Sequence, residues 1–404
     1  MKLVHEEFKT YRDGLRINGS MFRPQGNGPF PIVVVSHEFM MNRITTVAYT
    51  VMLAKMGYAA FCYDFNGGGS ISQSEGKTTD MSVLTEKKDL YAVIDYAKKQ
   101  PYTDENHLTL WGCSQGGMVS SLVAAELGKD VVEKLVLFYP ALSIPDDARK
   151  GSMILAKFDP QNVPKTLFCG PIILGTQYVT DVLEMDPYSL LDKYHGPVLI
   201  LHGNADHIVD HSYSVKAYEA YCKSNQAALE AGEIDELPQV DFKTIEKAGH
   251  MFMRPTSKID ALNTVKEFLQ GRTEILELDV RLTGLGLIFE NGKLNLHLPF
   301  KGNADGKYIR GSVQPNASDE RYYELGKPSD ICADYVISGK DPENEDVSVH
   351  VQNRNVKGGW KPTVSSIGDS LAFLNKTEAF ARLRQRGVKG PLVRIFADYK
   401  ATKE

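Results

Sequence analysis

Short apolar runs alternate with longer segments of helical spacing over the first two thirds of the chain. The runs have the length and composition of strands, and they cover residues 29–37, 58–65, 107–112, 134–140, 196–203 and 239–246. Several are apolar at nearly every position, as expected of strands buried on both faces of a parallel sheet. The segments between them include two predicted helices: 46–57, which ends at Gly57, and 81–100, which is opened by Asp80 as the N-cap. This alternation predicts an α/β domain with a mainly parallel sheet flanked by helices.

Three further segments define the domain plan. Residues 3–10 and 15–24 flank the turn Arg12-Asp13-Gly14, which predicts an antiparallel hairpin. Some fifty residues lie between the strand-like runs 134–140 and 196–203, and an insertion of about this length usually forms a functional substructure. We predict a cap over a binding cleft at about 143–190, with an insertion that only packs on the body as the alternative.

From Thr273 onward, short alternating strands are separated by turn signals, and only 370–385 is expected to form a helix. This pattern predicts a second, all-β domain, either a small barrel or a sandwich, in which closure removes exposed strand edges. We place the α/β domain at 1–271 and the β-barrel-like domain at 272–404.

The bulk properties exclude several classes of protein. A chain of 404 residues with a net charge of −5 and 42% hydrophobic residues is expected to be globular, and it lacks the basic character of a nucleic-acid-binding protein. No apolar run is long enough for a signal peptide or a membrane span, so no membrane partner is expected. The five cysteines are scattered and odd in number, which favours free thiols and a cytoplasmic location.

The stretch GCSQGG predicts a catalytic nucleophile. Gly112-Cys113-Ser114-Gln115-Gly116 matches G-x-S-x-G, a pattern that is weak by itself. Here a strand is expected to end at Gly112 and a helix to begin directly after Ser114, which is the arrangement of a nucleophile elbow. Ser114 is therefore the predicted nucleophile. Cys113 occupies a flanking position, where the elbow points the side chain away from the cleft.

A serine hydroxyl needs a base and a group that orients that base. In this architecture the acid and the base follow the serine in the order Asp/Glu, then His, each in a loop after a strand. Asp206 and His250 satisfy this order, and Asp210 is a second candidate acid. A metal site is the competing interpretation for the dense set of His202, Asp206, His207, Asp210 and His211, but its spacing does not repeat one helical face.

The oxyanion that forms on the acyl carbon requires backbone N–H donors. We predict those of Gln115, directly after the nucleophile, and of Phe39, in the loop after the run 29–37. The glycine-rich stretch Phe65–Ser70 lacks the G-K-[ST] ending of a phosphate loop, and we expect a tight loop near the cleft instead.

Together, GCSQGG, SHEF, YDFNGGGS, HGNADHIV, KAGHMF and the inserted FDPQNVPK…ILGTQYV resemble the cinnamoyl and feruloyl esterases of the α/β-hydrolase superfamily, over roughly Phe30 to Phe268. The resemblance implies Ser114 as nucleophile, His250 as base, Asp206 as orienting acid, Phe39 and Gln115 as oxyanion donors, and a cap that shapes the acyl pocket. The chain departs from this family at Glu38, where glycine is usual, at Cys113, where histidine is usual, and at Gly67-Gly68-Gly69, where G-H-G is usual.

In the second domain, FKGNADGKYIRGSVQPNASDERYYE, ADYVISGKD and LVRIF resemble small β-barrel proteins of unassigned function. Three uses are open for it: a scaffold or oligomer contact, a wall of the substrate cleft, and a carbohydrate-binding module. The first two are favoured because candidate sugar platforms are sparse, namely Trp360, Tyr322 and Tyr323.

The sequence thus predicts a cytoplasmic serine ester hydrolase that cleaves hydroxycinnamoyl or similar small acyl esters through an acyl-enzyme, without a metal or organic cofactor. The partner is a small-molecule ester, and a homo-oligomer is possible. The alternatives are a general short-chain acyl esterase, an acyl-peptide or thioester hydrolase, and a non-catalytic binding protein that has kept the fold, which only Glu38 favours.

Overall fold

The computed structural model describes residues 2–69, 71–290, 293–323, 330–356, 359–367, 369–384 and 390–403. The chain divides into two compact units, Met1–Val265 and Lys266–Glu404. The sequence-based division lies between residues 271 and 272. None of the helices in the described segments combines the length and the apolar character that a bilayer span requires.

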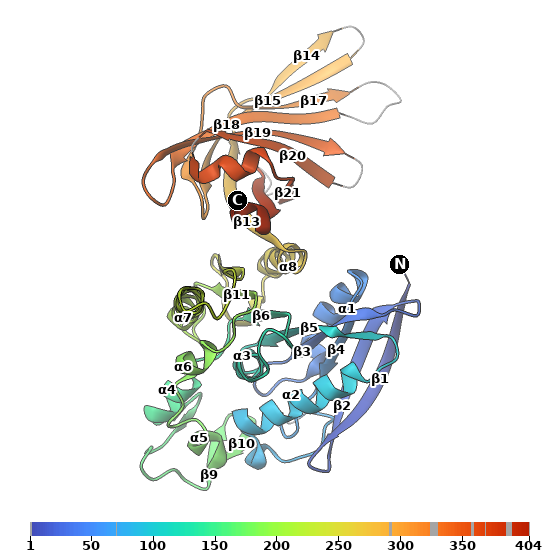
Figure 1. Ribbon diagram of the computed structural model, residues 1–404, viewed down its shortest axis with the longest axis vertical. Coiled ribbons are helices and arrows are strands. Elements are labelled where there is room, and N and C mark those ends of the chain that lie inside the picture. The colour runs from blue at the N-terminus through green and yellow to red at the C-terminus, as the bar shows by residue number, and fades with distance from the viewer. Residues whose placement is uncertain are drawn as a thin grey trace. The chain divides into compact units, whose positions relative to one another are not determined.

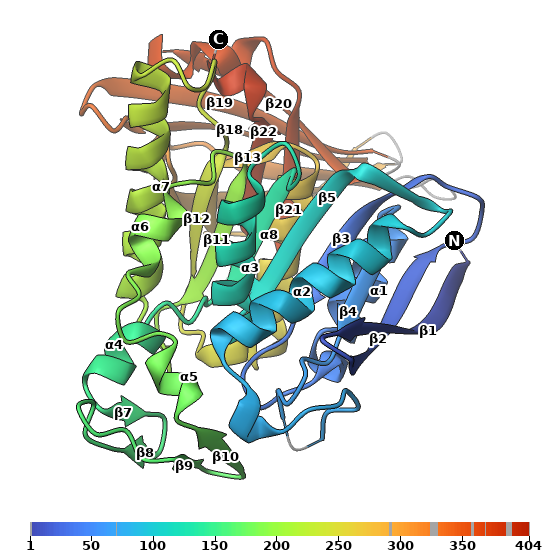
Figure 2. The ribbon, with the colours of Figure 1, turned by 60° about the horizontal axis from the view of Figure 1, so that its bottom comes forward.

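An eight-stranded sheet forms the centre of the first unit (Figure 2), in the order β1-β2-β4-β3-β5-β6-β11-β12. Its strands are β1 (Leu3–Arg12), β2 (Leu15–Pro24), β3 (Phe30–Ser36), β4 (Ala59–Tyr63), β5 (Thr103–Cys113), β6 (Lys134–Phe138), β11 (Val198–Gly203) and β12 (Val240–Ile245). Six of these strands, β4, β3, β5, β6, β11 and β12, run parallel to one another. Strands β1 and β2 form the predicted antiparallel hairpin, and β2 pairs antiparallel with β4. Its turn is closed by Asp13 and Gly14, both with positive φ. Because parallel strands end at one edge of a sheet, the loops after β3, β5, β6, β11 and β12 gather there.

Helices cover both faces of this sheet. Figure 2 shows α2 and α3 on one face and α1 on the other. The helices of the unit outside the insertion are η1 (Arg43–Thr45), α1 (Val47–Lys55), η2 (Thr78–Asp80), α2 (Val83–Lys98), α3 (Gln115–Leu127), α7 (Ser212–Glu230), η3 (His250–Phe252) and α8 (Pro255–Leu269), which crosses the division between the units. The N-cap of α2 is Ser82, not the predicted Asp80, because the Ser82 hydroxyl accepts from the Thr85 N–H in a capping box.

The insertion between β6 and β11 consists of short elements. They are α4 (Ile144–Arg149), β7 (Ser152–Met153), β8 (Ala156–Lys157), β9 (Thr166–Cys169), β10 (Ile172–Gly175), α5 (Gln177–Thr180) and α6 (Pro187–Leu191). The strands form two small antiparallel hairpins, β7 with β8 and β9 with β10, outside the large sheet.

The second unit is built on one antiparallel sheet, drawn in yellow to red in Figure 1. Its strands are β13 (Arg272–Leu282), β14 (Gly286–Glu290), β15 (Lys293–Asp305), β16 (Arg310–Val313), β17 (Ser318–Tyr323), β18 (Asp330–Lys340), β19 (Asp346–Val356), β20 (Gly359–Ile367), β21 (Ala379–Arg384) and β22 (Leu392–Asp398), with the 3-10 helices η4 (Asp369–Asn375) and η6 (Lys400–Lys403). Strand β13 pairs with β22 on one side and with β15 on the other, so the sheet closes on itself.

The helix predicted over 370–385 is wrong in its second half. Residues up to Asn375 form the 3-10 helix η4, whereas Ala379–Arg384 form strand β21, which pairs with β22; Gln385 lies outside the described residues. Pairing with a neighbouring strand and burial of alternate residues, Ala379 and Ala381, override the helical propensity of this alanine- and arginine-containing segment.

Candidate active site

Ser114 lies on a sharp turn between β5 and α3. Its backbone has φ 54° and ψ −118°, a conformation that is strained for a residue with a side chain. The flanking glycines are sterically required, because a Cβ atom on Gly112 would lie 2.1 Å from the carbonyl oxygen of Gly116, and one on Gly116 would lie 2.5 Å from that of His37. This geometry is that of a nucleophile elbow. Cys113 is fully buried, and burial holds the pKa of its thiol well above the usual range.

Ser114, His250 and Asp206 form one chain of hydrogen bonds. The Nδ1 atom of His250 lies 2.7 Å from Oδ2 of Asp206, and its Nε2 atom lies 3.0 Å from Oγ of Ser114. An ionised carboxylate can only accept, so Nδ1 carries the proton in a neutral imidazole and Nε2 accepts from the serine hydroxyl. The imidazole is thereby oriented to remove the proton of Ser114.

Asp206 is held by more donors than the sequence indicates. Its Oδ1 accepts from the backbone N–H groups of Ile208 (2.8 Å) and Val209 (3.1 Å), and its Oδ2 also lies 3.1 Å from Nε2 of His202. Nε2 of His202 also lies 3.1 Å from the carbonyl oxygen of Val209, so both of its partners are acceptors and Nε2 carries the proton; Nδ1 lies 2.7 Å from the hydroxyl of Ser214. Burial alone would raise the pKa of Asp206, but the hydrogen bonds from His202 and His250 hold it well below its ordinary value.

The second candidate acid, Asp210, has a different role. Its Oδ1 accepts from the N–H of Ser212, 2.9 Å away, at the start of α7, and its hydrogen bonds there lower its pKa. Of the other residues in the possible metal set, His211 lies 3.0 Å from the hydroxyl of Thr244, and His207 lines the cavity described below. Across the described ranges, no group of three or more His, Cys, Asp or Glu side chains is arranged to hold a metal ion.

The loop after β3 presents the Phe39 N–H. The carbonyl of Glu38 accepts from Nδ1 of His37 (2.7 Å) and from the N–H of Met41 (3.2 Å). Since the C=O and N–H of one trans peptide point in opposite directions, these bonds turn the Phe39 N–H the other way. Burial lowers the pKa of His37, so the ring is neutral, and its Nε2 accepts from the N–H of Phe65.

The second predicted donor, the N–H of Gln115, stands at the N-terminus of α3. Its side chain is fixed from two directions: Nε2 donates to Glu86 of α2 (2.7 Å), and Oε1 accepts from the hydroxyl of Tyr178 in the insertion. Burial raises the pKa of Glu86 well above its ordinary value. In the described part of the chain, the N–H groups of Phe39 and Gln115 have no hydrogen-bond partner, so both can donate to an oxyanion.

Glu38, which stands where the similar esterases usually have glycine, is buried, and both of its carboxylate oxygens accept hydrogen bonds. One carboxylate oxygen accepts from the hydroxyl of Tyr139 (3.0 Å) and the other from that of Thr45 (2.8 Å). Tyr139 follows β6 with a positive φ, and its ring packs 4.6 Å from that of His250. The side chain of Glu38 therefore supports the ring of His250 through Tyr139, whose hydrogen bond to Glu38 spans 101 residues of sequence.

The glycine-rich loop supports the same edge of the sheet. A Cβ atom on Gly69 would lie 2.8 Å from the carbonyl oxygens of both Met40 and Met41, so this glycine permits close packing against the loop that carries Phe39. The last residue of this stretch, Ser70, lies outside the described residues.

A cavity of about 430 Å³ opens at Ser114 and His250. The body contributes residues from the loops after β3, β6 and β11, and the insertion contributes a further wall made by Ser143, Ile144, Asp147, Ser152, Met153, Ile154 and Tyr178. Ile144, Met153 and Ile154 make this wall partly apolar. Asp147 brings a carboxyl group to it, which accepts from the Ser143 hydroxyl (3.0 Å), and burial raises its pKa.

Sequence reasoning missed three supporting residues: His202, Tyr139 and Tyr178. The contact of His202 with Asp206 could have been predicted, because a histidine at a buried strand end needs a polar partner and the candidate acid lies four residues later. No local pattern could have predicted the roles of the two tyrosines, since each contacts a residue that is far away in the sequence.

The family model of the X-Pro dipeptidyl-peptidases (S15 family) matches residues 13–159, which include the elbow. Two curated relatives are uncharacterized proteins. An Escherichia coli protein of 31.7 kDa from the traX-finO intergenic region is 27% identical over 95 residues, which are 23% of this chain and 32% of the relative. Bacillus subtilis YqkD is 25% identical over 190 residues, 46% of this chain and 59% of the relative. The chain thus spans less than two thirds of either relative.

Among solved structures, Est1E from Butyrivibrio proteoclasticus with ferulic acid bound has a TM-score of 0.57 and 28% sequence identity, covering 65% of this chain and 98% of Est1E. A second structure of Est1E gives a TM-score of 0.55 and 26% identity, with 65% and 97% covered. With its parallel sheet and nucleophile elbow, the unit Met1–Val265 is a member of the α/β-hydrolase superfamily.

Proposed function

We propose that the chain is a serine carboxylic ester hydrolase that cleaves hydroxycinnamoyl or similar small aromatic acyl esters. The observation that carries this proposal is the hydrogen-bonded chain from Ser114 through His250 to Asp206, at the floor of a cavity large enough for an aromatic acyl group. The similarity to Est1E, solved with ferulic acid, supports the choice of acyl group.

The reaction follows from the proton positions. His250 takes the proton of Ser114 as Oγ attacks the ester carbonyl, and Asp206 stabilises the imidazolium that forms. The N–H groups of Phe39 and Gln115 donate to the oxyanion. His250 then protonates the leaving alcohol, and a water molecule, activated by the same imidazole, releases the acid from the acyl-enzyme.

The cavity wall suggests how the acyl group is recognised. Its apolar lining residues suit an aromatic ring: Met40, Met41, Ala141, Ile144, Met153, Ile154, Ile208, Val209 and Met251. Asp147 is the carboxyl group contributed by the insertion to this wall, and it can accept from a phenolic hydroxyl.

A peptidase is the second candidate, because the matching family model is that of the X-Pro dipeptidyl-peptidases. In that reaction Asp147 would instead pair with the amino group of a short peptide. Both activities use the same nucleophile, so only the substrate separates them.

Two experiments test the proposal. A fluorophosphonate probe is expected to label the wild-type chain and not the Ser114→Ala variant; an unlabelled wild type would favour a non-catalytic binding protein. Methyl ferulate, short acyl nitrophenyl esters and glycyl-prolyl nitroanilide are then compared by kcat/KM. We expect methyl ferulate to exceed the nitroanilide, and the reverse order would assign a peptidase.

We also propose that the enzyme acts in the cytoplasm. None of the five cysteines, all of which lie in the described ranges, forms a disulfide bond, and three of them are buried, as expected of a protein that folds in a reducing compartment.

A further inference from the structure

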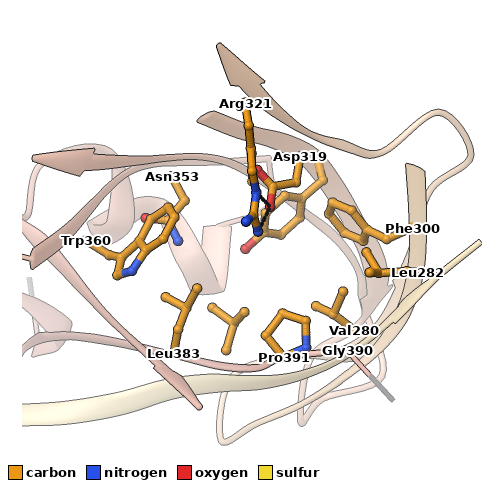
Figure 3. Close-up of a pocket in the computed structure, with 13 residues that line it drawn as sticks. Val280, Leu282, Phe300, Asp319, Arg321, Asn353, Trp360, Leu383, Gly390 and Pro391 are labelled. Carbon is orange, nitrogen blue, oxygen red and sulfur yellow. Dashed lines mark hydrogen bonds and ion pairs between the residues drawn. The ribbon is translucent and has the colours of Figure 1, made fainter. Parts of the chain in front are cut away.

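The closed sheet of the second unit contains a cavity of about 80 Å³ (Figure 3). Asp319, Arg321 and Asn353 point into it from one wall, whereas Val280, Leu383 and Pro391 line the opposite wall. The cavity therefore has a polar side and an apolar side. A volume of this size holds only a few water-sized groups, so it admits one edge of a ligand rather than a large molecule.

The strand register explains why a hollow forms here. Ala333 of β18 pairs with Asp319 of β17 on one side and with Asn353 of β19 on the other. Directly opposed residues share one face of the sheet, so the small methyl group stands between two polar side chains and leaves room above it. Tyr335, two residues along β18, projects from the same face.

Three polar atoms at this hollow are buried without a partner. They are the hydroxyl of Tyr335, Oδ1 of Asn353 and Oδ1 of Asp319, none of which has a hydrogen bond within the described residues. Tyr335 and Asn353 are 4% and 2% exposed. Such atoms are rare in folded proteins, because burial of a polar group without a hydrogen bond costs free energy. Their convergence on one cavity indicates a ligand that supplies the missing bonds.

The charges define the class of ligand. Arg321 donates to Oδ2 of Asp319 at 3.0 Å, so these two residues, the one cation and the one carboxylate among the described lining residues, neutralise each other. A neutral ligand is favoured over an anion. Asp319 and Asn353 offer acceptors, while the Tyr335 hydroxyl can donate or accept, so the ligand must present hydrogen-bond donors close together.

Adjacent hydroxyl groups satisfy this requirement, because each can donate and accept. The aromatic rings of Trp360 and Phe300 also line the cavity and can pack against an apolar ligand edge. We propose that this cavity binds a neutral ligand with adjacent hydroxyl groups, such as the terminal unit of a saccharide. This site is independent of the proposed ester hydrolysis.

The test uses the full chain with Ser114 blocked by a fluorophosphonate, or the Ser114→Ala variant if no label forms. Binding of arabinose, xylose, galactose and glucose is measured by saturation-transfer NMR and calorimetry, with acetate and benzoate as anionic comparisons. The variants are Tyr335→Phe, Asn353→Leu and Ala333→Leu, the last of which fills the hollow and keeps the polar groups. Tyr308→Phe is the matched control, because Tyr308 packs on Phe373 and does not line the cavity.

We expect saturable binding of at least one sugar, weakened at least about 10-fold by each cavity variant and unchanged by Tyr308→Phe. Tyr335→Phe removes an unpaired hydroxyl, so it should weaken binding without lowering the melting temperature. The proposal is overturned if no sugar binds, if the carboxylates bind instead, or if Tyr335→Phe binds sugar as the wild type does.

Discussion

The candidate active site of the α/β unit and the cavity of the β unit both bury polar side chains, but the two sites pair these side chains differently. In the first, every polar group of the Ser114–His250–Asp206 chain has a partner within the protein, and Asp206 has four. In the second, three polar atoms face a hollow without a partner in the described ranges.

The difference teaches what each region is built to do. A catalytic group must hold one orientation before the substrate arrives, so its hydrogen bonds are supplied by the fold. A binding cavity can leave its hydrogen-bonding capacity unused until a ligand completes it. The predictions below test this contrast, from the largest effect to the smallest.

Ser114→Ala should lower kcat for a nitrophenyl ester by a factor on the order of 10⁴ or more, because it removes the hydroxyl that is proposed to form the acyl-enzyme. Stopped assays with matched protein concentrations measure this. Cys113→Ala is the neighbouring control and should keep most of the activity. If Ser114→Ala turns over normally, the paired chain of side chains is not catalytic.

Asp206→Asn should lower kcat by roughly 10³- to 10⁴-fold, because the amide cannot hold His250 in the tautomer that accepts from Ser114. Asp210→Asn is the matched control, since the Asp210 side chain accepts from the Ser212 N–H at the start of α7 and takes no part in the Ser114–His250–Asp206 chain. Its kcat should stay within about twofold of the wild type. A larger loss in Asp210→Asn than in Asp206→Asn would reassign the acid.

Glu38→Ala should lower kcat by about 10- to 100-fold with little change in KM, because Tyr139 would no longer be held against His250. Glu38→Gln keeps an acceptor for Tyr139 and should recover most of the rate. Combining Glu38→Ala with Tyr139→Phe should give less than the product of the two losses, since both act through one contact. If the kcat loss of the double variant equals the product of the two single losses, Glu38 does not act on His250 through Tyr139.

The lowered pKa of Asp206 makes the α/β unit less stable in acid. Below the unfolded pKa, the unfolded chain binds a proton that the folded chain does not, so the free energy of unfolding falls as the pH drops from about 5 towards 3. Urea unfolding should show that the wild type loses on the order of 1 kcal/mol more than Asp206→Asn across this range. If the free energy of unfolding of the two proteins falls equally with pH, Asp206 is not held in its charged form by the fold.

Tyr335→Phe should leave the stability of the β unit unchanged or raise it by up to about 1 kcal/mol, because the hydroxyl it removes is buried without a partner. Thermal unfolding without ligand measures this. By contrast, Tyr139→Phe removes a paired hydroxyl and should destabilise the α/β unit by about 1 kcal/mol. A clear loss of stability in Tyr335→Phe would show that the two regions do not differ.

Local patterns were sufficient for most of the α/β fold. The runs at 29–37 and 107–112 became β3 and β5, because nearly continuous apolar character suits only a strand covered on both faces. The pattern was less decisive in the β unit. The segment 370–385 has helical composition, yet Ala379–Arg384 is a strand because β22 offers a pairing edge.

The sequence by itself determined the order of the chemistry: a serine between glycines, then an aspartate and a histidine, each just after a strand. These are local features, and the geometry of a parallel sheet brings strand ends together whatever the distance along the chain. Tertiary structure alone decided that Glu38 holds Tyr139, that Tyr178 holds Gln115, and that Ala333 leaves a hollow between Asp319 and Asn353. These contacts depend on strand register and side-chain packing across the fold, and no short stretch of sequence encodes either.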